Sequence, residues 1–160
     1  MYYTKNSDLN YYETHQWESN CGSYALRLNE WYDPEAYFEI KVGCIDDWAK
    51  ELGSNGYENF EVSTMYGEEL IKGMLEEFNG ELEICNGTIP EDPKVELIAF
   101  STLCNWRDDF ETVDIDFHFK VFRNGKWMEK CVTSEVREFD EFEWGPYNED
   151  VTYFYHRINN

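Results

Sequence analysis

The chain has 160 residues, and its 34 acidic and 13 basic side chains give it a formal net charge of -21. A charge of this sign repels nucleic acids and anionic membrane surfaces. No basic patch offsets it, so direct binding to either is not expected. Aromatic residues make up 18% of the sequence, which supplies enough apolar surface for a packed core and excludes a disordered chain. The length suits one domain.

The acidity has two explanations. The first is a solvated surface that keeps the protein in solution. The second is imitation of the phosphate backbone of a nucleic acid, by which an acidic protein occupies the binding site of a nucleic-acid-binding partner. The charge alone does not choose between them.

Five cysteines, an odd number, are spread through the chain without any Cys-x-x-Cys pair: Cys21, Cys44, Cys85, Cys104 and Cys131. A zinc site built from cysteines is therefore not expected, and we predict no metal and no cofactor. The first residues lack the basic and then apolar pattern of a secretory signal, and no apolar run approaches the roughly 20 residues of a membrane helix. These features predict a cytoplasmic protein whose thiols are reduced.

Residues 1–20 are polar and aromatic without a clear period, which predicts an irregular arm that lies across the body of the protein. From Cys21 onward, apolar residues recur at intervals of three and four: Tyr24, Ala25, Leu28, Trp31 and Tyr32. This spacing predicts a helix with one buried face, which Asp33-Pro34 then ends. Residues 37–42 are expected to form a short strand or an extended loop. Packing helices are predicted at 45–52 and 68–78.

The second half of the chain changes to strand patterns. Residues 113–123 and 126–132 alternate apolar and polar side chains on either side of Asn124-Gly125, which predicts a two-residue β-hairpin. A short strand is predicted at 82–84 and a buried one at 95–102, and the last strand at 151–158. We therefore predict an α+β fold in which the Cys21 helix packs on an antiparallel sheet.

Cys21 is the first candidate for a functional residue. Asn20 is a good helix N-cap, so Cys21 is expected in the first helical turn, where unpaired backbone N–H groups and the helix dipole stabilise a thiolate. The alternative is that Cys21 is a small buried apolar residue, as free cysteines often are.

His118 is the candidate base for this thiol. A hairpin turn at Asn124-Gly125 places His118, Lys120, Glu129 and Cys131 on one face of the two strands, with Glu129 within reach of the imidazole. The opposite face carries four apolar side chains: Phe117, Phe119, Val121 and Met128. A lone histidine on a strand is more often an ordinary polar residue. The chain order of cysteine, histidine and orienting residue is nevertheless that of papain-like thiol hydrolases.

Two segments resemble bacterial and phage proteins of the papain-like NlpC/P60 and CHAP group. They are Asn-Cys-Gly-Ser-Tyr-Ala-Leu at 20–26 and Asp-Phe-His-Phe-Lys-Val-Phe-Arg-Asn-Gly-Lys-Trp-Met-Glu-Lys at 116–130. The resemblance implies a single papain-like domain over 1–160, with Cys21 as the nucleophile and His118 as the general base. Glu129 matches the orienting residue, at a position where relatives often carry histidine. The peptidoglycan enzymes of the group are usually secreted, whereas this chain shows no signal.

Two functions follow as hypotheses. The first is a cytoplasmic cysteine hydrolase with a Cys-His-Glu triad that acts on a peptide, isopeptide or amide bond, for example in a host protein. Its oxyanion hole would combine the backbone N–H of Cys21 with the side chain of Gln16, which is otherwise a surface residue of the arm. The second is a non-catalytic, acidic inhibitor of phage type that blocks a basic, nucleic-acid-binding host partner.

Cys131 is expected to line the same cleft, because the hairpin register places it across from His118. It is then a bystander thiol, or it forms a disulfide with Cys21 under oxidation and switches the hydrolase off.

Overall fold

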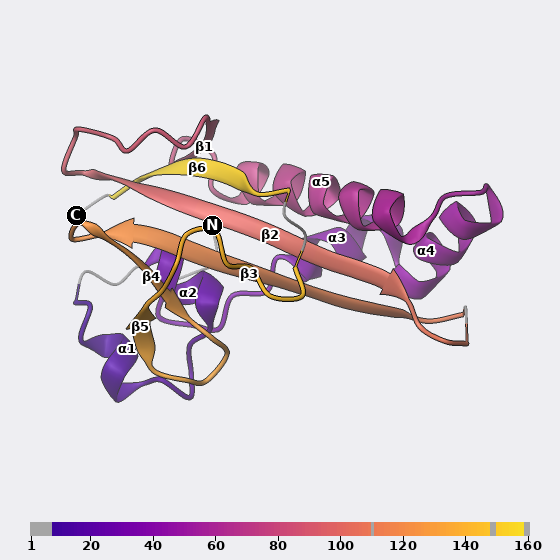
Figure 1. Cartoon of the computed structure of the whole chain (residues 1–160), viewed down its shortest axis with the longest axis horizontal. Helices are drawn as coiled ribbons and strands as arrows, with labels where there is room; N and C mark the ends of the chain where they lie inside the picture. The colour runs from indigo at the N-terminus through magenta and orange to yellow at the C-terminus, as the bar shows by residue number, and fades with distance from the viewer. Residues whose placement is uncertain (1–7, 110, 148–149, 159–160) are drawn as a thin grey trace.

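The computed structural model of the chain describes residues 8–109, 111–147 and 150–158. In these residues it contains five helices: α1 (Tyr11–Thr14), α2 (Cys21–Leu26), α3 (Glu35–Val42), α4 (Ile45–Ser54) and α5 (Asn59–Glu77). Six strands follow: β1 (Leu82–Cys85), β2 (Val95–Trp106), β3 (Val113–Arg123), β4 (Lys126–Lys130), β5 (Val136–Glu138) and β6 (Thr152–Arg157). The helices thus come first in the chain and the strands second (Figure 1).

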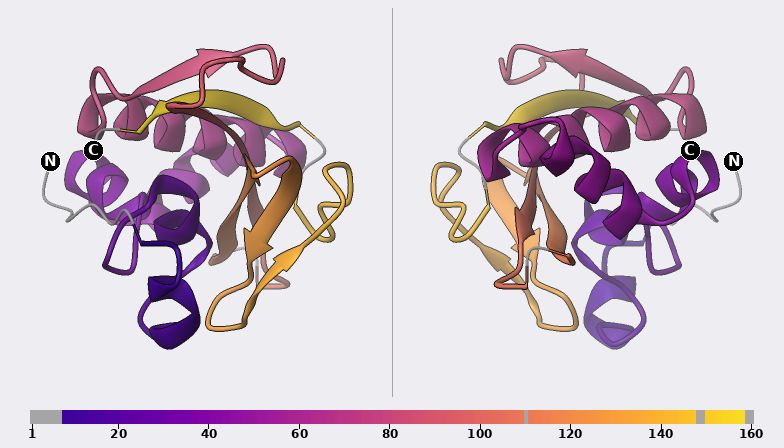
Figure 2. Two further views of the ribbon diagram at one scale, coloured as in Figure 1. Left: turned by 90° about the vertical axis from the view of Figure 1, so that its left-hand side faces the viewer. Right: turned by 90° about the vertical axis from the view of Figure 1, so that its right-hand side faces the viewer.

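All six strands belong to one antiparallel sheet with the order β1-β6-β2-β3-β4-β5. The helices gather on one face of this sheet, and the segment after β5 lies on the opposite face (Figure 2). The central strand β2 is therefore covered on both sides, and its residues are buried almost throughout.

The predicted α+β class, with a cysteine helix packed on an antiparallel sheet, is confirmed. The hairpin is also confirmed, since Asn124 and Gly125 both have positive φ angles, as a two-residue turn of type I′ requires. Its register pairs Arg123 with Lys126 and Val121 with Met128, which is the pairing that the sequence predicted. The strands expected at 82–84, 95–102 and 151–158 correspond to β1, β2 and β6, and the chain adds the short edge strand β5.

Two predictions for the helical half are wrong. Residues 37–42 belong to helix α3, which buries Phe38 and leaves Ile40 82% exposed, so packing against α5 overrides the strand-like composition. The Cys21 helix ends at Leu26 and not at Asp33-Pro34. Arg27 has a left-handed backbone conformation, and the N–H of Leu28 donates to the carbonyl of Ser23, as in a Schellman ending.

Two further segments are more regular than expected. The helix predicted at 68–78 is the later part of α5, which begins at Asn59. Part of the predicted arm forms α1, and its Tyr12 is fully buried, with its hydroxyl donating to the carbonyls of Ser23 and Leu28. The first seven residues of the predicted arm lie outside the described residues.

The turn at Arg27 brings α2 onto a buried ion-pair network. Glu96 on β2 accepts two hydrogen bonds from Arg123, at 2.6 and 2.7 Å, and two from Arg27, at 2.9 and 3.0 Å. Arg123 also donates to the carbonyls of Tyr24 and Ala25, which lie in the last turn of α2. One guanidinium therefore joins β3, β2 and the C-terminus of the cysteine helix.

No helix among the described residues is both long and apolar enough to cross a membrane.

The network predicts a large stability loss on Glu96→Gln. The substitution leaves the buried guanidinium of Arg123 and the partly buried one of Arg27 without their carboxylate, so we expect the free energy of unfolding to fall by about 3 to 5 kcal/mol in urea denaturation at pH 7. Glu83→Gln is the matched control, because the carboxylate of Glu83 lies 3.8 Å from exposed Arg157 and should matter by less than about 1 kcal/mol. Equal losses in the two variants would contradict the role of Glu96.

The same loss should depend on pH. Burial alone raises the pKa of Glu96, but hydrogen bonds from Arg123 and Arg27 outweigh it and lower the pKa to about 2. Because the folded pKa lies below the ordinary value, this stabilisation is complete above about pH 5 and is lost as the pH falls toward 2. The difference between wild type and Glu96→Gln should therefore shrink over that interval, and a difference that stays constant would contradict the assignment.

Candidate active site

Cys21 is the first residue of α2, and Asn20 fixes the start of that helix. The Asn20 side chain accepts from the N–H of Ser23 at 3.0 Å, while the hydroxyl of Ser23 accepts from the N–H of Asn20 at 2.7 Å, which closes a capping box. Asn20 also donates to the carbonyl of Tyr32 at 2.7 Å and accepts from its N–H. The residue before the thiol is therefore held from both sides.

The Cys21 thiol is buried between α2 and β3. Burial raises its pKa to about 12, although the backbone N–H groups of Phe119 and Gly22 donate toward the sulfur and act in the opposite direction. From the sequence we expect the helix start to lower the pKa of Cys21 and favour the thiolate. In the structure, burial of the thiol outweighs that effect. Ionisation of Cys21 near neutral pH therefore requires a neighbouring base that keeps the proton within the site.

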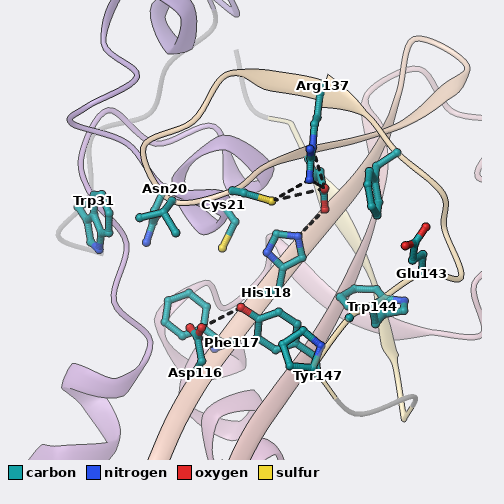
Figure 3. A pocket seen from close by; sticks show the side chains of 16 residues that line it. Asn20, Cys21, Trp31, Asp116, Phe117, His118, Arg137, Glu143, Trp144 and Tyr147 are labelled. Carbon is teal, nitrogen blue, oxygen red and sulfur yellow. Dashed lines mark hydrogen bonds and ion pairs between the residues drawn. The ribbon is translucent and has the colours of Figure 1, made fainter.

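That neighbour is His118. Its Nε2 atom lies 2.6 Å from Oε2 of Glu129, so the nitrogen left for Cys21 is Nδ1. Figure 3 shows the Cys21 side chain and a ring nitrogen of His118 pointing toward one another across the cavity. The imidazole of His118 therefore lies between the Cys21 thiol and the Glu129 carboxylate. In such an arrangement the imidazole can act as a base toward the thiol while the carboxylate orients it.

Glu129 is buried, and it is held by a second partner. Arg137 on β5 donates to its Oε1 through Nε at 3.2 Å and Nη2 at 3.0 Å. Burial raises the pKa of Glu129, but hydrogen bonds from His118 and Arg137 outweigh it, so the net pKa is below the ordinary value. The carboxylate stays ionised at neutral pH and can stabilise a protonated imidazole.

Aromatic side chains fix the plane of the His118 ring. Tyr147 stacks on it with ring centroids 5.5 Å apart, and Trp144 meets it edge to face at 5.9 Å. The Tyr147 hydroxyl donates to Asp116 at 2.8 Å, which ties the loop after β5 back to β3. The imidazole therefore has little freedom to rotate away from Glu129.

Cys21 and His118 open into a cavity of about 400 Å³, a size that suits a small-molecule or peptide site. Its walls carry the aromatic side chains of Trp31, Phe117, Phe139, Trp144 and Tyr147, and the charged groups of Asp116, Glu129, Arg137 and Glu143. The cavity is thus apolar around a few ionised groups. Because Arg137 is engaged with Glu129, the two other carboxylates give its mouth an acidic character.

Two buried lysines hold the walls of this cavity. The ammonium of Lys120 donates to the backbone carbonyls of Asp140, Glu141 and Glu143 and lies 4.4 Å from the ring centroid of Trp144. The ammonium of Lys130 donates to the carbonyls of Gln16, Ser19 and Val132. Lys120 therefore anchors the loop that carries the aromatic wall, and Lys130 anchors the segment that leads into Cys21.

The structure brings together Cys21, His118 and Glu129, as the sequence predicted. Gln16 is not among the described residues that line the cavity, and its carbonyl is turned to Lys130. The predicted oxyanion role of Gln16 thus gains no support from its position. The backbone N–H of Cys21 has no acceptor within its own helix, because it belongs to the first helical residue, and its oxyanion role stays a prediction. Cys131 lines the cavity as expected, and Cys21 and Cys131 are both free thiols.

Several residues of the site were missed from the sequence. Asp116 could have been found, since strand alternation puts it on the same face as His118. Arg137 lies on the short strand β5, which the sequence did not predict. Trp144 and Tyr147 belong to an irregular segment whose path depends on the buried ammonium of Lys120, and no local pattern encodes that path.

Lys120→Met tests the anchoring of the aromatic wall. The substitution keeps the apolar stem but leaves three backbone carbonyls without their donor, so we expect a stability loss of about 1 to 3 kcal/mol and faster amide hydrogen exchange in residues 139–147. Lys126→Met is the control, because the ammonium of Lys126 is exposed and lies 3.6 Å from Glu138. Unchanged exchange in 139–147 would show that other contacts hold this loop.

Comparison of the chain with protein-family models, with curated proteins and with solved structures gave no match.

Proposed function

We propose that this protein is a papain-like cysteine hydrolase that cleaves a peptide, isopeptide or amide bond. One observation carries the proposal. A cysteine at the start of a helix points toward an imidazole whose other nitrogen is 2.6 Å from a buried carboxylate. The resemblance of 20–26 and 116–130 to the NlpC/P60 and CHAP group supports the same assignment, since it selects the same three residues.

The reaction would begin with transfer of the Cys21 thiol proton to Nδ1 of His118. The sulfur then attacks the substrate carbonyl, and the oxyanion that forms is stabilised by the N–H of Cys21. Next, the imidazolium returns the proton to the leaving amine as the C–N bond breaks, which leaves a thioester on Cys21. His118 then deprotonates a water that attacks the thioester, and the thiol is regenerated with release of the acid.

Burial of the thiol sets what His118 must contribute. A Cys21 thiolate without a partner would be costly in this environment, as its raised pKa shows. An imidazolium beside the sulfur offsets that cost, and Glu129 with Arg137 behind it holds the imidazole in place. The free energy of the ion pair therefore depends on all three groups, and the site should lose reactivity steeply when any of them is removed.

The charge at the cavity mouth bears on the choice of substrate. We propose a cytoplasmic substrate, and a host protein is one candidate. The acidic mouth formed by Asp116 and Glu143 disfavours nucleic acids and other polyanions as substrates. We propose no membrane partner and no organic cofactor for the reaction.

A second function is favoured by one specific observation. The side chain of Cys21 is only 6% exposed, which also suits a structural cysteine in a non-catalytic protein. In that case the papain-like body would present its acidic surface to a basic host partner. Such a complex should weaken steeply between low and high salt in a pull-down from host lysate, and Cys21→Ala should keep its full biological effect.

Alkylation of the thiols tests the proposed nucleophile. With His118 as its base, Cys21 should react with iodoacetamide at pH 7, and His118→Ala should slow this labelling at least about tenfold, as followed by mass spectrometry. Without the base, the thiolate forms only as the pH approaches the raised pKa of about 12, so the rate in His118→Ala should climb through pH 10.

Cys104 is the internal control for this measurement, because it is also buried and burial raises its pKa to about 12 too. It should stay unlabelled in every variant that is folded. Labelling of Cys21 that is no faster than that of Cys104, or that is unchanged in His118→Ala, would refute an activated nucleophile. Glu129→Gln should give an intermediate rate, since it keeps the shape of the side chain but removes its charge.

Turnover is the second test. Fluorogenic peptide amides screened with the purified protein should give a signal that Cys21→Ala abolishes. Cys44→Ala should leave the signal intact, because Cys44 is exposed and is not among the residues that line the cavity. Turnover that persists in Cys21→Ala would assign the activity to a contaminant or to another site.

A further inference from the structure

Cys131 has no part in the hydrolytic steps, yet its thiol lies against them. Its Sγ is 3.4 Å from Oε1 of Glu129 and 3.6 Å from Nη2 of Arg137. One ligand atom each from His118, Glu129 and Cys131 can be chosen so that all three lie within 4.8 Å of one another. An imidazole nitrogen, a carboxylate oxygen and a thiol sulfur therefore converge beside the candidate nucleophile.

This donor set is typical of Zn²⁺. Zinc binds histidine, carboxylate and thiolate at about 2.0 to 2.3 Å, so the ligand atoms of a tetrahedral site lie roughly 3.3 to 3.8 Å apart. The atoms that lie farthest apart need to approach by about 1 Å to reach that geometry, whereas Nε2 of His118 and Oε2 of Glu129, now 2.6 Å apart, need to separate slightly. Hard cations such as Ca²⁺ and Mg²⁺ prefer sites made of oxygen atoms alone, and a thiolate disfavours them.

We infer that His118, Glu129 and Cys131 form a Zn²⁺ site whose occupation inhibits the hydrolase. Cys131 would bind as the thiolate and release its proton to solvent. The fourth position would face the cavity, where water can fill it. Metal binding takes the imidazole from its role as a base. This inference departs from the prediction of no metal, which rested on the lack of a cysteine-only zinc site in the sequence.

Arg137 is the main obstacle to metal binding, because its guanidinium contacts both Glu129 and Cys131. Its side chain is 54% exposed, so it can swing into solvent when a dication takes its place. Arg137 therefore competes with the metal, and its loss should strengthen binding. A substitution of Arg137 that only disturbed the structure would weaken metal binding, so tighter binding distinguishes the two cases.

The inhibition rests on the proposed function, whereas the metal site does not, and binding can be measured without turnover. Zn²⁺ is titrated into the reduced, full-length protein in competition with a chromophoric chelator. We expect one Zn²⁺ per chain. Cys131→Ser should weaken binding by more than the roughly 10- to 100-fold that loss of a supporting residue costs, because it removes a ligand. Cys44→Ser is the matched control and should bind as the wild type does.

Cobalt identifies the thiol involved. Co²⁺ bound to a thiolate gives a sulfur-to-metal charge-transfer band, which should be present in the wild type and in Cys21→Ser and absent in Cys131→Ser. Arg137→Met should show tighter binding than the wild type. Absence of stoichiometric binding, a band that survives in Cys131→Ser, or weaker binding in Arg137→Met would each overturn the inference.

Turnover then separates the two proposals. If the hydrolase exists, low Zn²⁺ should inhibit the wild type. Relative to its own rate without metal, the Cys131→Ser variant should be at least tenfold less sensitive to Zn²⁺. If no substrate is turned over while one Zn²⁺ still binds through Cys131, the hydrolase proposal fails and the metal site stands. Equal inhibition of the wild type and Cys131→Ser would show that the metal acts through Cys21 and His118 alone, against the inference.

Discussion

The buried guanidinium of Arg123 is the constraint on which the candidate site depends. It forms a two-pronged ion pair with Glu96, donates to two carbonyls at the end of α2 and stacks on Tyr24, 4.6 Å from its ring centroid. Helix α2 has only six residues, too few to be stable in isolation. The position of Cys21 is therefore set by the sheet, through this side chain, more than by the helix that carries it.

The same device recurs on both sides of the site. Lys130 binds the carbonyls of the segment that leads into α2, and Lys120 binds those of the loop that carries Trp144 and Tyr147. In each case a cation on β3 or β4 satisfies backbone oxygens that have no partner in a helix or strand. Burial lowers the pKa of both lysines. Carboxylates, Glu129 first, oppose the change at Lys120, and the thiols of Cys21 and Cys131 oppose it at Lys130. The hairpin thus acts as a scaffold. The ammonium groups of its two buried lysines hold the irregular segments on either side of the site in place.

The sequence predicts those features of the fold that neighbouring residues determine, and it misses those that depend on contacts between distant segments. The hairpin, its register and the pairing of His118 with Glu129 depend on Asn124-Gly125 and on strand alternation, which are written in consecutive residues. The class of the fold followed from the same patterns. By contrast, the prediction of a short strand or extended loop at 37–42 is wrong. Tyr37, Phe38, Ile40 and Val42 favour strands, but in the fold they belong to α3, which packs against α5 and α4.

The missed parts of the site share one cause. Buried cations on distant strands hold three of these parts. Arg123 binds the last turn of α2, Lys130 binds the carbonyl of Gln16, and Lys120 binds the loop with Tyr147. A hydrogen bond from a side chain to a backbone carbonyl leaves no trace in the sequence around that carbonyl. The raised pKa of Cys21 was also not predictable from the sequence. It comes from burial of the thiol, and the depth of burial depends on what packs over it.

The distance along the chain between α2 and its anchor also has a consequence for biosynthesis. Arg123 lies 99 residues after Tyr24, and the partners of Cys21 in the hairpin follow at similar separation. A growing polypeptide exposes the cysteine long before the strands that complete its surroundings have been made. Until then the thiol has no imidazole beside it and no sheet to dock on. A hydrolase assembled in this order would stay inert during its own translation, which protects a producing cell from premature cleavage by nascent chains.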